Sequence, residues 1–307
     1  MNVFFEILFK LLPFYLIAAL GFLLNKKFRI SQEFLAKIFF YILMPVVVFY
    51  GVLKVPLLSD DILLPLFYFV ISVVFSLLYW FIGGYFWKDT TKNLLAFTNG
   101  ISNVGNLGTP LAIALFGREA TGPAVLITIG GIFYINTVGY YIALKGHFSA
   151  KDSLYKLLRL PSFYAFFLAI LFQLFGINLL QIKGAGIMDR FVDGYNILGL
   201  LLLGISIEKI RKEQLDKLYL FLTMTAKFIV YPVCFGLFLF LDSRYFHIFN
   251  SVSHQVLLLQ SLIPVGVNVV SLAIVTKVHP EKAAAGVLIS TLFSLIYIPV
   301  MAALFLK

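Results

Sequence analysis

Apolar stretches of about 20 residues fill most of the 307-residue chain, and short polar connections separate them. A helix rises 1.5 Å per residue, so about 20 residues cross the roughly 30 Å of hydrocarbon in a bilayer. The predicted fold class is therefore an all-α polytopic membrane protein. The pattern predicts ten transmembrane helices, at residues 4–24, 34–53, 62–86, 94–116, 122–144, 161–179, 192–207, 218–241, 255–276 and 282–306.

The fourth of these stretches is interrupted in its middle. Residues 99–110 read NGISNVGNLGTP, with three Asn, three Gly and one Pro between two apolar flanks. Hydrocarbon cannot satisfy bare backbone N–H and C=O groups, so non-helical backbone at this depth must be buried in protein or line a wet cavity. The pattern is typical of a discontinuous helix at the binding site of a transporter.

A second interruption lies in the ninth stretch. Residues 265–274 align without a gap on residues 104–113 and share Val, Gly, Leu, Ala and Ile, with Pro264 opposite Asn103. Each half crosses the membrane five times, so the second half is inserted upside down. We predict a 5+5 inverted repeat with broken, crossing helices 4 and 9: a first repeat at 1–144, a cytoplasmic linker at 145–160 and a second repeat at 161–307.

Composition and charge fit this topology. The chain is 61% hydrophobic and 12% charged, and its formal net charge is +10. Most Lys and Arg residues fall in the odd-numbered loops, which predicts that these loops are cytoplasmic and that both termini lie outside. The expected partner is the lipid bilayer, with no nucleic acid.

The interruptions provide a candidate anion site. A broken helix offers unpaired N–H groups and a partial positive charge at its new N-terminus, where a carboxylate is a natural ligand. Thr109 followed by Pro110 is a good start for the second half-helix, with Thr109 as the cap. Side chains around the same point supply donors and acceptors: Asn99, Asn103, Asn106, Gln260, Asn268 and Ser271. The alternative is that these amides only satisfy the broken backbone.

Two further residues have open interpretations. Lys227 lies about nine residues into the eighth span, where a cation should face the bundle and have a partner. It is either a partner of a substrate carboxylate or a snorkelling residue closer to the surface. Tyr134 in the fifth span could reach the crossing point or could simply pack there.

The residues of an enzyme or a metal centre are missing from the pattern. There is no intramembrane nucleophile with a base, no His-Glu-x-x-His, no phosphate loop and no CxxC, and Cys234 is the single cysteine. We expect no enzyme activity, no cofactor and no metal. An acidic residue at the membrane centre is also missing, which argues against an antiporter built on buried carboxylates. Sodium held by amide and backbone oxygens, or proton coupling, stays open.

These motifs resemble the auxin efflux carrier family, which includes plant PIN-FORMED proteins and bacterial malonate and malate permeases. The resemblance rests on residues 97–110 with Gly117 and Ala124, on Met44 and Pro45, and on residues 264–268 with Ala273. It implies a fold like the bile-acid symporters, with a scaffold from spans 1, 2, 6 and 7 and a mobile core from spans 3–5 and 8–10. It further implies a homodimer in a bacterial cytoplasmic (inner) membrane that moves organic anions by an elevator-type excursion of the core.

The resemblance also assigns residues to the crossing point: Asn103, Asn106, Pro110, Pro264 and Asn268. One departure is that Ser271 stands where the fourth span has Pro110, and the ninth span has a single Asn.

The leading hypothesis is a secondary transporter for small organic anions, either carboxylates such as malate and malonate or auxin-like acids. A membrane-embedded sensor or interaction protein with a carrier fold is the first alternative, and a cation-coupled antiporter is the second.

Overall fold

The computed structural model describes residues 3–54, 63–177, 179–181, 186–208 and 215–305, and the side chains of these residues except 3–11, 14 and 181. Within these ranges the chain is helical, and its only β-type pairing is an isolated two-residue bridge. The fold is thus all-α, as the apolar pattern predicts.

The helices follow one another along the chain with short η turns between many of them, of which η3 and η5 are 3₁₀ turns and the others are π-helical. The elements are α1 (Val3–Phe28), α2 (Gln32–Ile38), η1 (Phe39–Leu43), α3 (Met44–Leu53), α4 (Leu63–Phe86), α5 (Thr91–Asn99), η2 (Val104–Gly108), α6 (Thr109–Phe116), η3 (Arg118–Ala120), α7 (Thr121–Tyr134), η4 (Ile135–Gly139), α8 (Tyr140–Lys145), α9 (Ala150–Leu158), α10 (Pro161–Leu174), η5 (Leu179–Gln181), α11 (Ile187–Glu208), α12 (Lys217–Thr225), η7 (Ala226–Val230), α13 (Tyr231–Leu241), η8 (Asp242–Phe246), α14 (Ser251–Ser261), α15 (Asn268–Thr276) and α16 (Pro280–Phe305).

Six continuous helical segments of the described chain are long and apolar enough to cross a membrane: Gln32–Leu53, Leu63–Phe86, Arg118–Lys145, Ile187–Glu208, Lys217–Phe246 and Pro280–Phe305. A seventh is possible if α9 and α10, which are bent by 52° against each other, form one span. These match six or seven of the ten predicted spans. The others are α1 and the two interrupted regions, so the ten-span count stays a prediction.

The outer face of α4 explains why this surface needs lipid. Large apolar side chains three or four residues apart are exposed along one side of the helix: Leu66, Val70, Val74, Leu77 and Phe81. The opposite side buries Ser72 and Ser76 together with Tyr68 and Tyr79. A helix that exposes its apolar face and buries its hydroxyls is adapted to hydrocarbon, and the chain is therefore an integral membrane protein.

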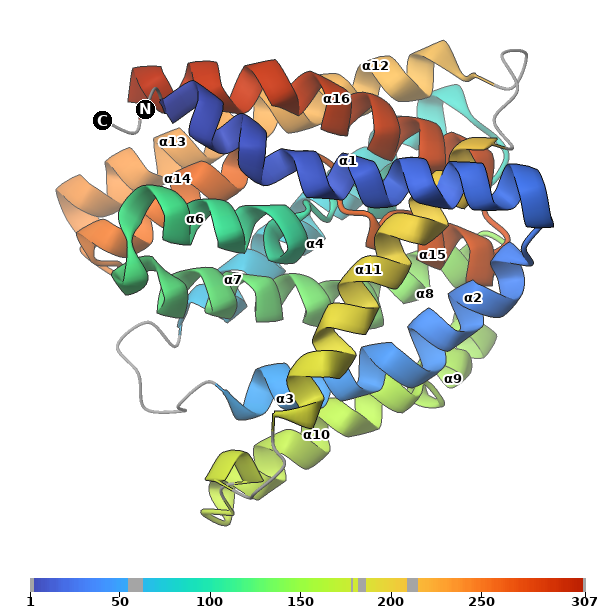
Figure 1. Cartoon of the computed structure of the whole chain (residues 1–307), viewed down its shortest axis with the longest axis horizontal. Coiled ribbons are helices and arrows are strands. Elements are labelled where there is room, and N and C mark those ends of the chain that lie inside the picture. Colours follow the sequence, from blue (N-terminus) through green and yellow to red (C-terminus); the bar gives the residue numbers. More distant parts are fainter. Residues whose placement is uncertain (1–2, 55–62, 178, 182–185, 209–214, 306–307) are drawn as a thin grey trace.

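Small residues let the long helices approach closely. α1 packs along α11 and also contacts α16 (Figure 1). A Cβ atom added to Gly204 would lie 1.9 Å from the carbonyl oxygen of Ala18, and one added to Gly21 would lie 2.4 Å from that of Leu201. Contact of this kind between helix backbones is the usual means of helix association in membranes.

A second close contact joins α4 to α7. A Cβ atom on Gly130 would lie 2.4 Å from the carbonyl oxygen of Pro65. α4 also packs on α5, and α3 packs on α10. α1 begins and α16 ends at the same end of the molecule (Figure 1).

Candidate functional site

The chain leaves the helical conformation at both places that the sequence singles out. α5 ends at Asn99, and the chain becomes helical again at Val104, where η2 leads into α6. α14 ends at Ser261, and α15 begins at Asn268. Residues 100–103 and 262–267 are the two interruptions.

The two interruptions lie against each other and pair through their backbones. Ser102 and Val265 form the antiparallel bridge, and the N–H of Asn103 donates to the carbonyl oxygen of Pro264 at 2.8 Å. The N–H of Val265 donates to the hydroxyl oxygen of Ser290 at 3.3 Å. Each interruption therefore satisfies part of the other's exposed backbone, as buried non-helical chain requires.

After the first interruption, the helix begins again earlier than the sequence suggests. The prediction of Thr109 as the cap of this second half-helix is therefore wrong. Asn103 precedes the new helix, and its carbonyl oxygen accepts from the N–H groups of Leu107 and Gly108. Thr109 lies inside the helix, and its hydroxyl donates backward to the carbonyl oxygen of Val104 at 3.1 Å. The π-helical turn Val104–Gly108 accounts for the difference, because it extends the helix by one wide turn before Pro110.

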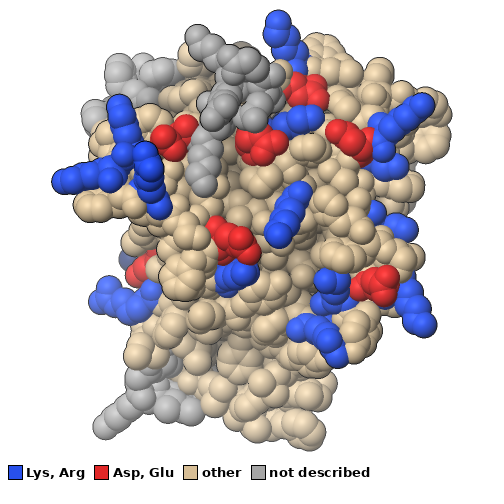
Figure 2. Space-filling view, turned by 90° about the vertical axis from the view of Figure 1, so that its right-hand side faces the viewer, with Lys and Arg blue, Asp and Glu red and all other residues tan. Residues whose placement is uncertain are grey.

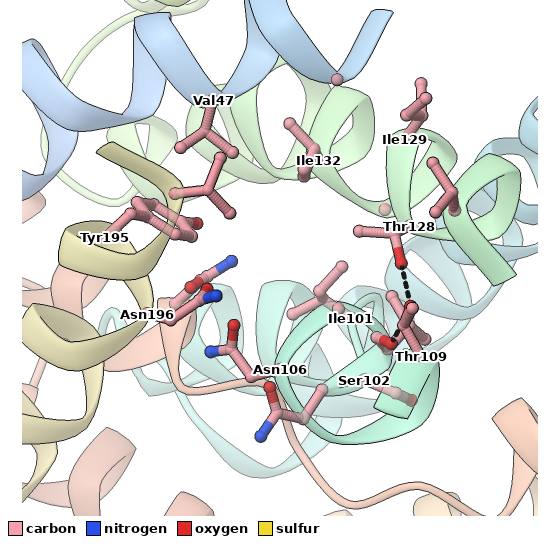
Figure 3. A pocket seen from close by; sticks show the side chains of 18 of the residues that line it. Val47, Ile101, Ser102, Asn106, Thr109, Thr128, Ile129, Ile132, Tyr195 and Asn196 are labelled. Carbon is pink, nitrogen blue, oxygen red and sulfur yellow. Dashed lines mark hydrogen bonds between the residues drawn. The ribbon is translucent and has the colours of Figure 1, made fainter. Parts of the chain in front are cut away.

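A pocket of about 190 Å³ opens beside the paired interruptions (Figure 3). Its walls come from α3, the first interruption with η2, α7, α11 and the start of α15. Val47, Ile129 and Ile132 form an apolar wall, and Asn106 and Asn196 lie across from it (Figure 3). A hydrogen bond of 3.1 Å between the hydroxyls of Thr109 and Thr128 closes one side.

Neutral amides supply most of the polarity of this pocket. The side chains of Asn103, Asn106, Asn196 and Asn268 line it, and the side-chain oxygen of Asn268 is buried without a hydrogen-bond partner among the described residues. The N–H groups of residues 104–106 begin a helix, where backbone donors lack intrahelical acceptors. The site therefore offers several donors and a partial positive charge to a small ligand.

Lys54 is the one cation among the lining residues that the structure describes, and it lies at the end of α3. Its Nζ is 3.0 Å from Oδ1 of Asp189 and 4.1 Å from the centre of the Tyr50 ring, and the Tyr50 hydroxyl donates to the same Asp189 oxygen at 2.8 Å. Burial alone lowers the pKa of Lys54, but its contacts with Asp189 and Tyr50 outweigh that effect and raise the pKa above its ordinary value. Lys54 is therefore charged at neutral pH.

Four of the ten site residues predicted from the sequence line the pocket: Asn103, Asn106, Thr109 and Asn268. Pro264 contributes its carbonyl oxygen to the pairing of the interruptions, and Pro110 is exposed on the outside of α6. Ser271 is fully buried, and its hydroxyl has no partner among the described residues. The Nδ2 of Asn99 donates to the carbonyl oxygen of Leu95 at 2.9 Å.

Tyr134 and Lys227 contact the first interruption from outside the pocket. Tyr134 is fully buried, and its hydroxyl donates to Ser76 at 2.8 Å. A Cβ atom on Gly100 would collide with this hydroxyl at 2.0 Å, so the interruption passes directly over the ring. Lys227 is fully buried, and its Nζ reaches the carbonyl oxygen of Asn99 and the hydroxyl of Ser102.

Several lining residues are not among those predicted from the sequence. They are Tyr50 and Lys54 on α3, Thr128 on α7, and Tyr195 and Asn196 on α11. The adjacent polar pair Tyr195 and Asn196, directly before the long apolar run of α11, is a signal that could have indicated this helix.

Gln260 is a further candidate from the sequence, and it packs behind η2. Its side chain is fully buried, and neither amide atom has a partner among the described residues. A Cβ atom on Gly108 would lie 1.9 Å from its Oε1. Within the described part of the chain, no group of three or more His, Cys, Asp or Glu residues could hold a metal ion.

Comparison with known proteins agrees with this architecture. Residues 6–302 match the family model described as "Membrane transport protein". The chain is also 25% identical over 287 residues to the uncharacterized transporter MJ1031 of Methanocaldococcus jannaschii, an alignment that covers 89% of this chain and 91% of that protein. With nearly its whole length matched, the chain belongs to this membrane transport protein family, the auxin efflux carriers, and is a transporter of that class.

Proposed function

We propose that this transporter moves small organic anions and binds them in the pocket beside the paired interruptions. The observation that carries the proposal is the composition of that pocket. It combines four Asn side chains and one Lys with the first turn of a half-helix, and none of its described lining residues is a carboxylate. Amide donors, a helix N-terminus and a lysine all favour a carboxylate ligand.

The size of the pocket supports a small substrate. A volume of about 190 Å³ is below the roughly 300–1,000 Å³ of pockets that hold drug-sized ligands. This favours acids of the size of malonate or malate over indole-3-acetate. The apolar wall from α3 and α7 faces the carbon chain of the substrate, and the amides face its oxygens.

The arrangement of helices supports alternating access of the elevator type. We define a scaffold group (α1, α2, η1, α3, α10 and α11) and a core group (α4–α8 and α12–α16). Several of the most extensive helix contacts lie within one group, as between α1 and α11, α3 and α10, and α4 and α7. The pocket has walls from both groups, so a relative movement of the two would carry the ligand along. We retain the 5+5 inverted repeat as the plan of this movement.

The distribution of charge supports an orientation. Figure 2 views the end of the molecule opposite the one where α1 begins, and Lys and Arg are spread over it with fewer Asp and Glu between them. By the positive-inside rule we assign this end to the cytoplasm. The pocket residue Lys54, at the end of α3, then lies toward the outside.

A thermal-shift screen of the purified protein in detergent tests the proposed substrate class. The panel contains malonate, malate, succinate, indole-3-acetate and the neutral diamide of malonate. A ligand that binds only the folded state raises its apparent stability, so we expect malonate or malate to raise the Tm and the diamide to leave it unchanged. Absence of a shift with every anion would contradict the proposal.

Uptake by proteoliposomes then tests the position of the site. Asn103→Ala and Asn268→Ala should each abolish uptake of the stabilising anion while the purified protein stays monodisperse. Asn93→Ala is the matched control, because this buried Asn lies outside the pocket and donates to the carbonyl oxygen of Ile142. Normal uptake by both site variants would place the binding site elsewhere.

A further inference from the structure

Lys227 is a buried lysine that the proposed binding pocket does not use. It lies in the π-helical turn Ala226–Val230, within the membrane-spanning segment Lys217–Phe246, and its side chain is fully buried. None of the described carboxylates lies within ion-pair distance of it, and it is not among the residues that line the pocket. An ammonium group at such a position is retained only if other groups replace its water.

Three groups around the ammonium supply that replacement. The Nζ atom lies 3.1 Å from the hydroxyl oxygen of Ser102, 3.4 Å from the carbonyl oxygen of Asn99 and 4.0 Å from the centre of the Tyr231 ring. A lysine has three N–H donors, so each has an acceptor in this arrangement. The Tyr231 hydroxyl donates to the same Asn99 carbonyl oxygen at 2.8 Å and holds it in place.

The end of α5 and the π-helical turn after α12 position the groups of this site. Asn99 is the last residue of α5, so its carbonyl belongs to the end of a half-helix, where carbonyls lack intrahelical donors and carry partial negative charge. Pro232 has no N–H to donate to the carbonyl of Phe228, and the Tyr297 hydroxyl donates to that oxygen at 2.6 Å instead. The π-helical turn that carries Lys227 is therefore held by Tyr297 through the Phe228 carbonyl, and by Asn99 through the Lys227 side chain.

A half-helix carbonyl, a hydroxyl oxygen and an aromatic face are ligands for a small monovalent cation. In carriers with broken helices, carbonyls at half-helix ends coordinate the coupling ion. We propose that the Lys227 ammonium is a tethered cation that fills this monovalent-cation site at the first interruption, so that substrate binding does not require sodium. This inference rests on the proposed anion transport, since it concerns the ion dependence of the same carrier.

The position of Ser102 links this cation to the substrate pocket. Ser102 accepts from Lys227, pairs with Val265 through the backbone bridge and also lines the pocket. Lys227 thus positions the interruption and adds positive potential behind it without touching the ligand.

Cation replacement tests the proposal directly. The Tm of the wild-type protein in detergent should be the same in sodium, potassium and choline chloride at equal ionic strength. Lys227→Ala vacates the site, so its Tm should fall in choline chloride and recover by at least ~2 °C in sodium or methylammonium chloride, since either cation can enter. Lys282→Ala is the matched control: Lys282 contacts Thr91 and Asp216 away from the interruption, and its loss should not be rescued selectively by any cation.

Two results would overturn the proposal. One is selective stabilisation of the wild-type protein by sodium, and the other is a Lys227→Ala protein whose Tm is equal in all of these salts. If Lys227→Ala does not fold, the wild-type comparison still decides, together with Lys227→Arg, which keeps the charge and should remain independent of sodium.

The substrate screen separates this inference from the proposed function. An anion that raises the wild-type Tm equally in choline and sodium supports both. An anion shift that appears only in sodium keeps the function and overturns the tethered cation. Absence of any anion shift overturns the function, while the rescue of Lys227→Ala still reports on the cation site.

Discussion

At the scale of single residues, the pocket depends on neutral amides rather than on fixed charges. An Asn side chain both donates and accepts, so Asn103, Asn106, Asn196 and Asn268 can surround a carboxylate without another anion nearby. Lys54, which is the only charged residue in the described lining, is half exposed and already paired with Asp189. In the proposed anion site, the amides and the half-helix start therefore contribute more to selection for anions than Lys54 does.

A change of charge at Asn106 tests this view. Asn106→Asp keeps the shape of the side chain but adds a carboxylate, which should lower the affinity for the substrate anion at least ~10-fold, because like charges in a poorly solvated pocket repel each other. The affinity is measured by isothermal titration at pH 7. Asn106→Ala is the comparison, and an Asp variant that binds the anion better than the Ala variant would contradict the prediction.

Tyr134 is predicted to support the site from behind. Tyr134→Phe removes the hydroxyl that donates to Ser76 and leaves Ser76 Oγ without that donor, which should reduce the free energy of unfolding by about 1 kcal/mol. Anion affinity should stay unchanged, as measured by the same titration. A large loss of affinity with an unchanged Tm would instead place the hydroxyl in contact with the ligand.

At the scale of elements, the sequence predicts where helices break but not how they continue. Asn, Gly and Pro mark the interruption between α5 and η2, because these residues disfavour a helix. The restart at Val104 could not be predicted, since a π-helical turn has no side-chain signature of its own. The walls from α3 and α11 were also missed, because apolar periodicity does not say which helices pack together. One of the two acceptors of Lys227 was also not predicted, because it is the backbone carbonyl of Asn99.

The contact between α1 and α11 provides a test at this scale. Gly204→Val should destabilise the protein severely, because its Cβ would overlap the backbone of α1 at Ala18. Gly194→Val on the same helix is the matched control, since a Cβ there meets no atom within 4 Å. Size-exclusion profiles and Tm values of the two variants should differ clearly, and equal stability would show that the helices are farther apart.

Asp216 joins three elements at one point, and its contacts predict that the stability of the protein depends on pH. Its carboxylate caps α12, and it accepts from Trp87 Nε1 after α4 and from Lys282 Nζ on α16, at 3.0 and 3.1 Å. Burial opposes its ionisation, but the Tyr219 N–H, Lys282 and Trp87 together outweigh burial, so its pKa lies below the ordinary 3.8.

A folded-state pKa below the unfolded value means that Asp216 contributes stability above pH 3.8 and loses this contribution as the pH falls through the folded pKa. Asp216→Asn should therefore lower the Tm at pH 7, and the difference from wild type should shrink below about pH 4. A difference that is constant from pH 7 to pH 3 would contradict the prediction.

At the scale of the whole molecule, the two helix groups meet at the pocket, and their relative movement can be blocked. A Cβ atom on Gly51 of α3 would lie 3.8 Å from Cγ1 of Ile129 on α7, so these two positions face each other in van der Waals contact and are a suitable pair for a cross-linking test. In a Cys234→Ser background, Gly51→Cys with Ile129→Cys should lose transport on oxidation and regain it on reduction, as measured in proteoliposomes. Full transport by the oxidised protein would show that α3 and α7 do not separate during the cycle.

The pairing between the two interruptions is made by main-chain atoms, so most side-chain substitutions leave this pairing intact. The bond from the Asn103 N–H to the Pro264 carbonyl oxygen uses no side-chain atom. Any residue at position 103 other than proline keeps the donor, and any residue at position 264 keeps the acceptor. The side chains around the pocket are thus free to change with the substrate while the two halves of the chain stay joined.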